Sequence, residues 1–177
     1  MFIFEYVIML AIICLMIFFL VQFYNIVFRG YAPFIPSRSA AMKKVVDALD
    51  IKADGTIYEL GSGSASFLRL ARQKYPQAKL IGIEYSIMPY AIAQIQNSLS
   101  HSKIKFMKKN FFKVDLSDAD VIYCFLNMKT MQDLEPKLAK ECKPGALLIS
   151  YYFSLPGHTP VNVVENKHHD KMLFYRF

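Results

Sequence analysis

The chain has 177 residues, a net charge of +7 and a hydrophobic fraction of 54%. Its mean hydropathy of +0.25 is too high for an ordinary soluble domain, so we expect a membrane segment beside one domain. Three cysteines are too few for a disulfide framework, and they are not spaced as metal ligands. We expect no metal site, because the adjacent His168 and His169 would point apart in a hairpin turn. The positive charge suits anionic lipid headgroups, and nucleic acid is not an expected partner because no recognition motif accompanies the charge.

The first 28 residues contain one charged residue, Glu5, and are apolar from Tyr6 to Tyr24 apart from Gln22. About 20 apolar residues span the hydrocarbon core of a bilayer. A cleaved signal peptide would have a basic start, a shorter apolar run and a small-x-small cleavage site, none of which is found here. We therefore predict a transmembrane anchor over residues 1–28.

Basic residues follow this anchor and none precedes it. The positive-inside rule then places the rest of the chain on the cytoplasmic side. We predict a single-pass protein of the cell (inner) membrane with a cytoplasmic domain. The basic residues on which this orientation depends are Arg29, Arg38, Lys43 and Lys44.

Residues 29–50 are predicted to form a linker and a first helix. Pro33 and Pro36 exclude a helix and favour an extended segment. Ser37 or Ser39 can cap a helix that runs to about Leu49. The apolar face of that helix would comprise Ala41, Val45, Val46 and Leu49.

Residues 51–177 alternate between short apolar strands and helices, which predicts an α/β domain with a Rossmann-like, mostly parallel sheet of seven strands. In the helix that contains Pro89, the residues Ala91, Ile92 and Ile95 are expected to face the sheet. The other helices are expected at Ala65–Lys74 and Lys129–Lys140. The strands are expected at Thr56–Leu60, Lys79–Glu84, Lys103–Met107, Val121–Leu126 and Ala146–Phe153, with a closing antiparallel hairpin formed by Val161–Val164 and Met172–Phe177.

The turn after the first strand is the most informative feature of this domain. Gly61 and Gly63 allow the backbone to turn tightly and to approach a ligand where a Cβ would intrude. The second strand ends in another acid, Glu84, 21 residues after Gly63. A carboxylate at that place offers acceptors for the two hydroxyls of a ribose. The spacing therefore predicts a nucleoside-binding site at the carboxyl ends of the first two strands.

The complete turn reads Glu59-x-Gly61-x-Gly63-x-Ala65, which resembles motif I of the class I (seven-β-strand) S-adenosylmethionine-dependent methyltransferases. Two proline segments, Pro33 to Ser37 and Pro156 to Pro160, make the resemblance more specific than motif I alone. With the N-terminal anchor, they resemble the membrane-anchored lysine methyltransferases whose eukaryotic members modify the c subunit of ATP synthase, and their small prokaryotic relatives. The chain departs from the family pattern at Ser64-Ala65, where the family has Asp-Gly, and at Phe34, where tyrosine is common.

This resemblance implies S-adenosylmethionine as the cofactor and assigns roles to single residues. Glu59 would hold the ammonium end, the backbone from Gly61 to Gly63 would pass beneath the cofactor, and Glu84 would bind the ribose. Asn110 would bond the adenine edge, with Tyr85 or Phe111 against its ring. The complete cofactor-binding prediction comprises Glu59, Gly61, Ser62, Gly63, Glu84, Tyr85, Asn110 and Phe111.

The methyl acceptor would bind near Phe34, Asn127 and His158, the three candidate catalytic residues. Asn127 follows the fourth strand, but the Asp/Asn-Pro-Pro-Tyr signature of many amino methyltransferases is absent, since the chain reads Asn127-Met128-Lys129. No dedicated general base stands out. The leading hypothesis is methylation of a protein lysine at the cytoplasmic face of a membrane protein. A lipid or quinone-like acceptor and a non-catalytic, membrane-bound nucleoside sensor or scaffold are the alternatives.

Overall fold

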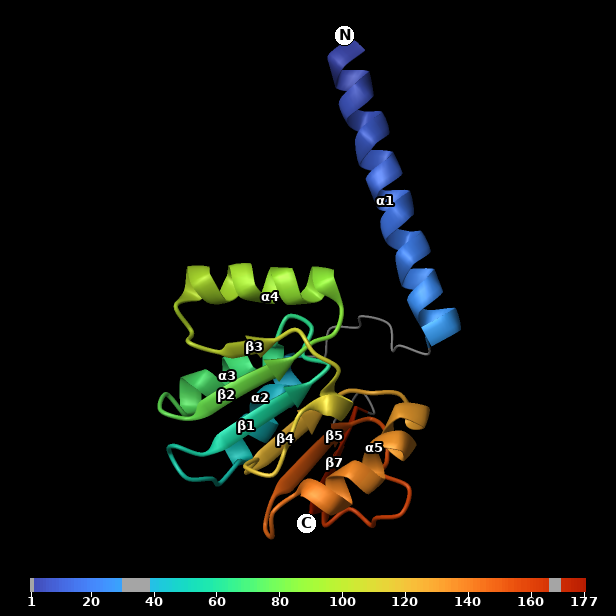
Figure 1. Ribbon diagram of the computed structural model, residues 1–177. Coiled ribbons are helices and arrows are strands. Elements are labelled where there is room, and N and C mark those ends of the chain that lie inside the picture. The colour runs from blue at the N-terminus through green and yellow to red at the C-terminus, as the bar shows by residue number, and fades with distance from the viewer. Residues whose placement is uncertain (1, 30–38, 166–169) are drawn as a thin grey trace. The chain divides into compact units, whose positions relative to one another are not determined.

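Seven strands form one sheet, in the order β3-β2-β1-β4-β5-β7-β6, in the computed structural model of this chain (Figure 1). The structure describes residues 2–29, 39–165 and 170–177. All neighbouring pairs from β3 to β5 are parallel, and β7 pairs antiparallel with both β5 and β6. This topology confirms the predicted fold class, including the antiparallel C-terminal hairpin. The strands are β1 (Thr56–Leu60), β2 (Lys79–Ile83), β3 (Lys105–Met107), β4 (Val121–Cys124), β5 (Leu147–Tyr151), β6 (Asn162–Glu165) and β7 (Lys171–Arg176).

The chain divides into two units, Met1–Ile35 and Pro36–Phe177. The first unit contains α1 (Phe2–Arg29), a helix of 28 residues that would be about 42 Å long at 1.5 Å per residue. Its segment Ile3–Val21 has a mean hydropathy of 2.8, and none of its residues is buried. By length and composition this helix could cross a bilayer. The Pro33–Ser37 segment lies outside the described residues.

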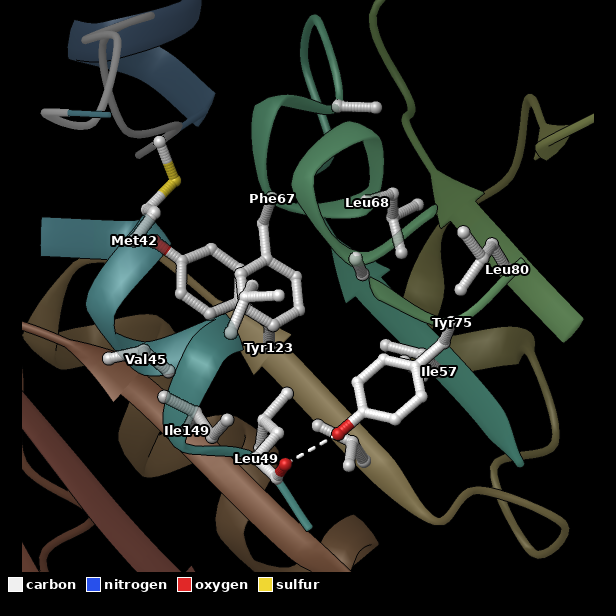
Figure 2. Close-up of a cluster of buried hydrophobic side chains, with 14 of the residues drawn as sticks. Met42, Val45, Leu49, Ile57, Phe67, Leu68, Tyr75, Leu80, Tyr123 and Ile149 are labelled. Carbon is white, nitrogen blue, oxygen red and sulfur yellow. Dashed lines mark hydrogen bonds between the residues drawn. The ribbon is translucent and has the colours of Figure 1, made fainter. Parts of the chain in front are cut away.

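Helices cover both faces of the sheet in the second unit. One face carries α2 (Ser39–Ala48), α3 (Ser66–Lys74) and α4 (Ile87–Ser100), and the other carries α5 (Met128–Glu141). On the first face, the rings of Phe67 and Tyr123 stack with centroids 4.1 Å apart beside Met42 of α2 (Figure 2). The buried side chains on both faces explain why the central strands are continuous apolar runs.

Four strands are shorter than the sequence predicts, and two of the differences have a cause in the backbone. The strand β2 ends one residue before Glu84, at Ile83. Lys103 has a φ of 52°, in the left-handed region, so β3 cannot begin before Ile104. Tyr152 has a φ of 76°, so β5 ends at the residue before it, Tyr151. The strand β4 ends at Cys124, where the chain leaves the sheet and then starts α5.

The packing face predicted for α4 is wrong. Ala93 is fully buried against the sheet and Tyr90 packs beside it, whereas Ile92 and Ile95 are 46% and 61% exposed, and Ala91 is exposed as well. The small side chain of Ala93 lets the helix approach the sheet closely. The larger apolar residues therefore point away from the core.

Candidate active site

The turn between β1 and α3 has the backbone that its glycines predict. Gly61 and Gly63 have φ values of 66° and 50°, a region that is costly for residues with a Cβ. A Cβ on Gly61 would also lie 3.4 Å from the Cδ2 atom of Leu126. The amide of Ser62 donates to the carbonyl of Ile83 at 3.0 Å, which joins the turn to the end of β2. The loop is thus fixed at the carboxyl ends of two neighbouring parallel strands.

Glu84 fastens this turn from the end of β2. Its Oε2 accepts from the amide of Gly63 at 3.0 Å, and its Oε1 accepts from the amide of Ser86 at 2.7 Å. Glu84 is 9% exposed, and its bond to Gly63 is buried while its bond to Ser86 is partly buried. A carboxylate has about four acceptor sites, so these two donors leave capacity for the hydroxyls of a ribose.

Glu59 lies on β1 beneath the first turn of α3. That helix begins after Ala65, which has no side chain able to cap it, and the Oε2 of Glu59 accepts from the amide of Leu68 at 3.2 Å instead. Burial raises the pKa of Glu59 to about 8, although backbone hydrogen bonds from Leu68 and Phe67 and the charge of Arg69 act in the opposite direction. The part of the chain that the structure describes gives this buried acid no ion pair.

These features fit a cofactor that has a ribose and a positive charge. The glycine turn provides main chain without side chains, Glu84 is held with acceptor sites to spare, and Glu59 is a buried acid that a cation would stabilise in its ionised form. The hydroxyl of Ser62 is also buried, and it has no hydrogen-bond partner among the residues that the structure describes.

The three residues expected around the adenine lie at the ends of β2 and β3. Tyr85 directly follows Glu84 and is 49% exposed. Asn110 uses its Oδ1 to accept from the amide of Phe112 at 3.0 Å and so begins the 3-10 turn Phe111–Lys113. The rings of Phe111 and Phe112 lie 4.7 Å apart. Because β2 and β3 are parallel neighbours, all three residues lie at the same edge of the sheet as the glycine turn.

The candidate residues for the acceptor pocket that the structure describes do not lie together. Asn127 lies at the correct edge, after β4, but its Oδ1 caps α5 by accepting from the amide and the hydroxyl of Thr130, both at 2.8 Å. His158 lies elsewhere: its Nδ1 is 2.9 Å from Oε1 of Glu135 in the middle of α5, and its ring lies beside Phe177. Phe34 lies outside the described residues.

The sequence did not predict an aromatic cluster that the structure contains. We define this cluster as Phe125, Tyr151, Tyr152 and Phe153. It lies at the carboxyl ends of β4 and β5, next to the turn after β1 in the strand order. Phe125 and Tyr151 contact edge to face, with centroids 4.8 Å apart, and Tyr152 is 52% exposed in a left-handed conformation. Unusual backbone of this kind concentrates at functional sites. The run Tyr151-Tyr152-Phe153 at the end of a strand was the available signal.

Residues 2–29, 39–165 and 170–177 contain no group of three or more His, Cys, Asp or Glu side chains that could hold a metal ion.

Residues 59–162 match the ANTKMT methyltransferase domain family. The chain belongs to this family. It is an S-adenosylmethionine-dependent methyltransferase, and the matched range begins at Glu59 and ends at the start of β6. The resemblance carried by motif I is thereby confirmed.

Two curated relatives and one solved structure show how far the similarity extends. The enzyme is 28% identical over 137 residues to a protein-lysine N-methyltransferase of Saccharolobus islandicus (strain REY15A), covering 76% of this chain and 85% of that protein. It is 29% identical over 138 residues to the ATP synthase c-subunit lysine N-methyltransferase of Caenorhabditis elegans, covering 72% and 70%. The crystal structure of an RNA methyltransferase from Salinibacter ruber shares the fold, with a TM-score of 0.75, 22% identity, and coverage of 80% and 93%.

Proposed function

We propose that this enzyme methylates the side-chain amine of a lysine in a membrane protein at the cytoplasmic face. The proposal rests on the position of the aromatic cluster. The cluster follows β4 and β5, and β4 is the direct neighbour of β1, so the cluster lies at the same edge of the sheet as the glycine turn. The relatives whose names specify a lysine acceptor support the choice of substrate class.

The cofactor would be held by the residues that the sequence singled out. Glu59 would pair with the ammonium group, the turn from Gly61 to Gly63 would pass beneath the cofactor, and Glu84 would accept from the ribose hydroxyls. S-adenosylmethionine supplies an activated methyl group on a positively charged sulfur. The adenine would lie against Tyr85 or Phe111, with Asn110 at its edge.

The acceptor lysine would enter through the aromatic cluster. Aromatic faces attract an ammonium group, and their low polarity favours the neutral amine that can attack a methyl group. In-line transfer requires mainly that the nucleophile be aligned, and rings packed against one another are rigid enough to align it. Asn127, at the same edge, would orient the amine. His158 is left out of this proposal because its contacts to Glu135 and Phe177 hold it away from the turn.

The membrane assignment is supported by the helix Phe2–Arg29, which has the length and composition of a span, and by the basic residues that follow it. A tethered enzyme meets a membrane-bound acceptor at a raised effective concentration. A compartment-sensitive reporter at the C-terminus tests the orientation, and activity of the reporter on the outer side would reverse it.

The cofactor assignment is tested by calorimetry with S-adenosylmethionine. Glu84→Ala should weaken binding about 100-fold, since it removes two charge-assisted hydrogen bonds that each contribute about 1.5–3 kcal/mol and hold the site in shape. Glu141→Ala is the matched control, because Glu141 also accepts from a backbone amide, that of Leu116 at 3.1 Å, but lies in α5. Equal binding by the two variants would refute the role of Glu84.

The acceptor class is tested by incubating membranes with the enzyme and cofactor labelled in the methyl group, followed by phase extraction and mass spectrometry. Label on protein lysine is the expected result. Label in the lipid phase would favour a lipid or quinone-like acceptor instead.

A further inference from the structure

The outer face of α4 carries a continuous apolar stripe that nothing in the described chain covers. Met88, Ile92, Ile95 and Leu99 are 54%, 46%, 61% and 77% exposed. They recur at intervals of four, three and four residues, which places them on one face of the helix. That face is opposite Ala93, the one fully buried residue of α4. Exposed apolar patches of this kind mark interaction sites.

A lysine cluster, defined as Lys103, Lys108 and Lys109, lies at the two ends of β3, the edge strand beside α4. All three side chains are exposed. Lys105 is exposed as well, but it points to the opposite face of the sheet, because the next residue, Phe106, packs on the α4 face. The helix α4 leads from the carboxyl end of β2 back to the amino end of β3 (Figure 1). Lys103 therefore lies toward the C-terminal end of the helix, and Lys108 and Lys109 lie toward its N-terminal end. No Asp or Glu occurs between Tyr85 and Val114.

We propose that α4 and the lysine cluster form a docking surface for an anionic bilayer leaflet. An apolar helix face flanked by lysines is the composition of helices that lie in a membrane interface. The apolar side chains enter the boundary of the acyl chains while the lysines meet negatively charged headgroups. This surface is additional to α1, and it does not depend on the identity of the methyl acceptor.

The charge pattern favours a bilayer over a second copy of the chain. The spacing of the stripe would also suit a helix pair, but paired helices usually carry complementary charges beside the seam. Two copies joined along α4 would bring together surfaces that both carry lysines and no acids. Like charges at an interface oppose association, whereas anionic lipid neutralises them.

The docking surface is connected to the active site through Arg69. Its Nε donates to the carbonyl of Ser64 in the glycine turn at 3.0 Å, and its Nη2 donates to the carbonyl of Ala93 at 3.3 Å and to Gln96 Oε1 at 3.1 Å. The first residue of α4 is also only three residues after Glu84. Docking would therefore hold the cofactor edge of the sheet at the leaflet.

The chain contains no tryptophan, so a single introduced tryptophan reports on its own surroundings. Ile95→Trp in the full chain would be reconstituted into nanodiscs of phosphatidylcholine alone or with phosphatidylglycerol, with or without brominated acyl chains. Gln132→Trp is the control, because Gln132 is exposed on α5 at the other face of the sheet. The measurement requires no turnover, so its outcome is independent of the proposed methylation.

The expected result is a blue shift and a roughly twofold loss of emission with brominated lipid for Ile95→Trp in anionic discs, with little change for Gln132→Trp. Adding Lys108→Gln and Lys109→Gln should reduce the quenching, whereas Lys129→Gln and Lys140→Gln on α5 should not. Equal quenching of the two tryptophans would overturn the proposal. A blue shift that grows with protein concentration but is not quenched by brominated lipid would indicate self-association and would also overturn it.

Discussion

Glu59 has two roles, as the cap of α3 and as the buried acid proposed to pair with the cofactor. It caps a helix whose own capping position is Ala65, and it does so from a buried site without an ion pair in the described chain. Capping contributes about 1 kcal/mol, whereas burying an ionised carboxylate is more costly than this when no cation accompanies it. The apo enzyme therefore favours the protonated form of Glu59 near neutral pH.

The first prediction is that Glu59 makes the apo enzyme less stable as pH rises. With a pKa of about 8 in the folded state against an ordinary value of 4.5, the folded state binds more protons than the unfolded state between those values. The contribution of Glu59 to the free energy of unfolding should then be complete below pH 4.5. Between pH 4.5 and pH 8 the free energy of unfolding should fall by up to about 1.4 kcal/mol per pH unit. Glu59→Gln keeps an acceptor for the cap and should remove this slope. Denaturant unfolding of both proteins at pH 5 to 8 measures it, and parallel curves would contradict the prediction.

The second prediction concerns the cofactor. If the ammonium group of S-adenosylmethionine pairs with Glu59, binding at pH 7 should ionise the carboxyl group and release a proton. Calorimetry in two buffers with different ionisation enthalpies measures the number of protons released. The wild type should release close to one proton and Glu59→Gln close to none. The same count for both would separate Glu59 from the cofactor and leave it only as a helix cap.

The spacing of the two acids and the glycines is visible in the sequence, but what their side chains contact is not. Motif I predicts where Glu59 and Glu84 lie, because strand ends and turns are local features. That Glu84 bonds the amides of Gly63 and Ser86, or that Glu59 caps α3, depends on rotamers set by packing. The contact between His158 and Glu135 joins segments 23 residues apart, and no local pattern predicts it.

At the scale of secondary structure, α4 shows where periodicity stops being informative. The helix has apolar residues on two faces, and the sequence pattern does not indicate which of them packs. The sequence analysis predicts that the face with Ile92 and Ile95 packs on the sheet. In the structure the face with Ala93 packs there, since a small residue permits close approach to the sheet. An apolar face is thereby left for another partner. The helices α3 and α5, with one apolar face each, were predicted to within two residues at either end.

The third prediction concerns the attachment of α2. Lys74 of α3 donates to three carbonyls at the end of α2, those of Val46, Asp47 and Leu49, at 3.2, 2.7 and 2.6 Å. The Val46 carbonyl also accepts from the amide of Leu49, and the Leu49 carbonyl also accepts from the hydroxyl of Tyr75. Hydrogen bonds to charged groups such as the Lys74 ammonium contribute about 1.5–3 kcal/mol. Lys74→Met should lower the free energy of unfolding by about 2 kcal/mol.

Lys43→Met is the matched control for this variant. Lys43 also interacts with Asp47, at 2.9 Å, but as an exposed ion pair within α2. Such pairs contribute less than about 1 kcal/mol, so its removal should change stability little. Denaturant unfolding compares the two variants. If both changed stability equally, the carbonyl contacts of Lys74 would not be what holds α2.

For the molecule as a whole, the order of the strands follows from rules that the sequence already satisfies. Short crossovers with right-handed connections place β2 and β3 on one side of β1, and β4 and β5 on the other. The carboxyl ends that carry Glu59, Glu84 and Asn127 then meet at one edge, as the sequence analysis expected. The aromatic cluster was not predicted, since it depends on the end of β5 at Tyr151 and on the left-handed backbone of Tyr152 that follows.

The last prediction distinguishes the role of the N-terminal helix from that of the unit that contains the site. Ile12→Arg with Met16→Arg places two charges in the middle of the Ile3–Val21 segment, and each costs about 2.5–3.5 kcal/mol at the centre of a membrane helix. The variant should be released by alkaline carbonate extraction, whereas Ile12→Leu with Met16→Leu should stay in the membrane fraction. Cofactor binding should be the same for both, because the substitutions lie outside the unit that contains the site. Methylation of membrane acceptors should fall for the arginine variant alone, since it loses the effective concentration that tethering provides. If membrane proteins were labelled equally by both variants, the helix would have no part in bringing enzyme and acceptor together.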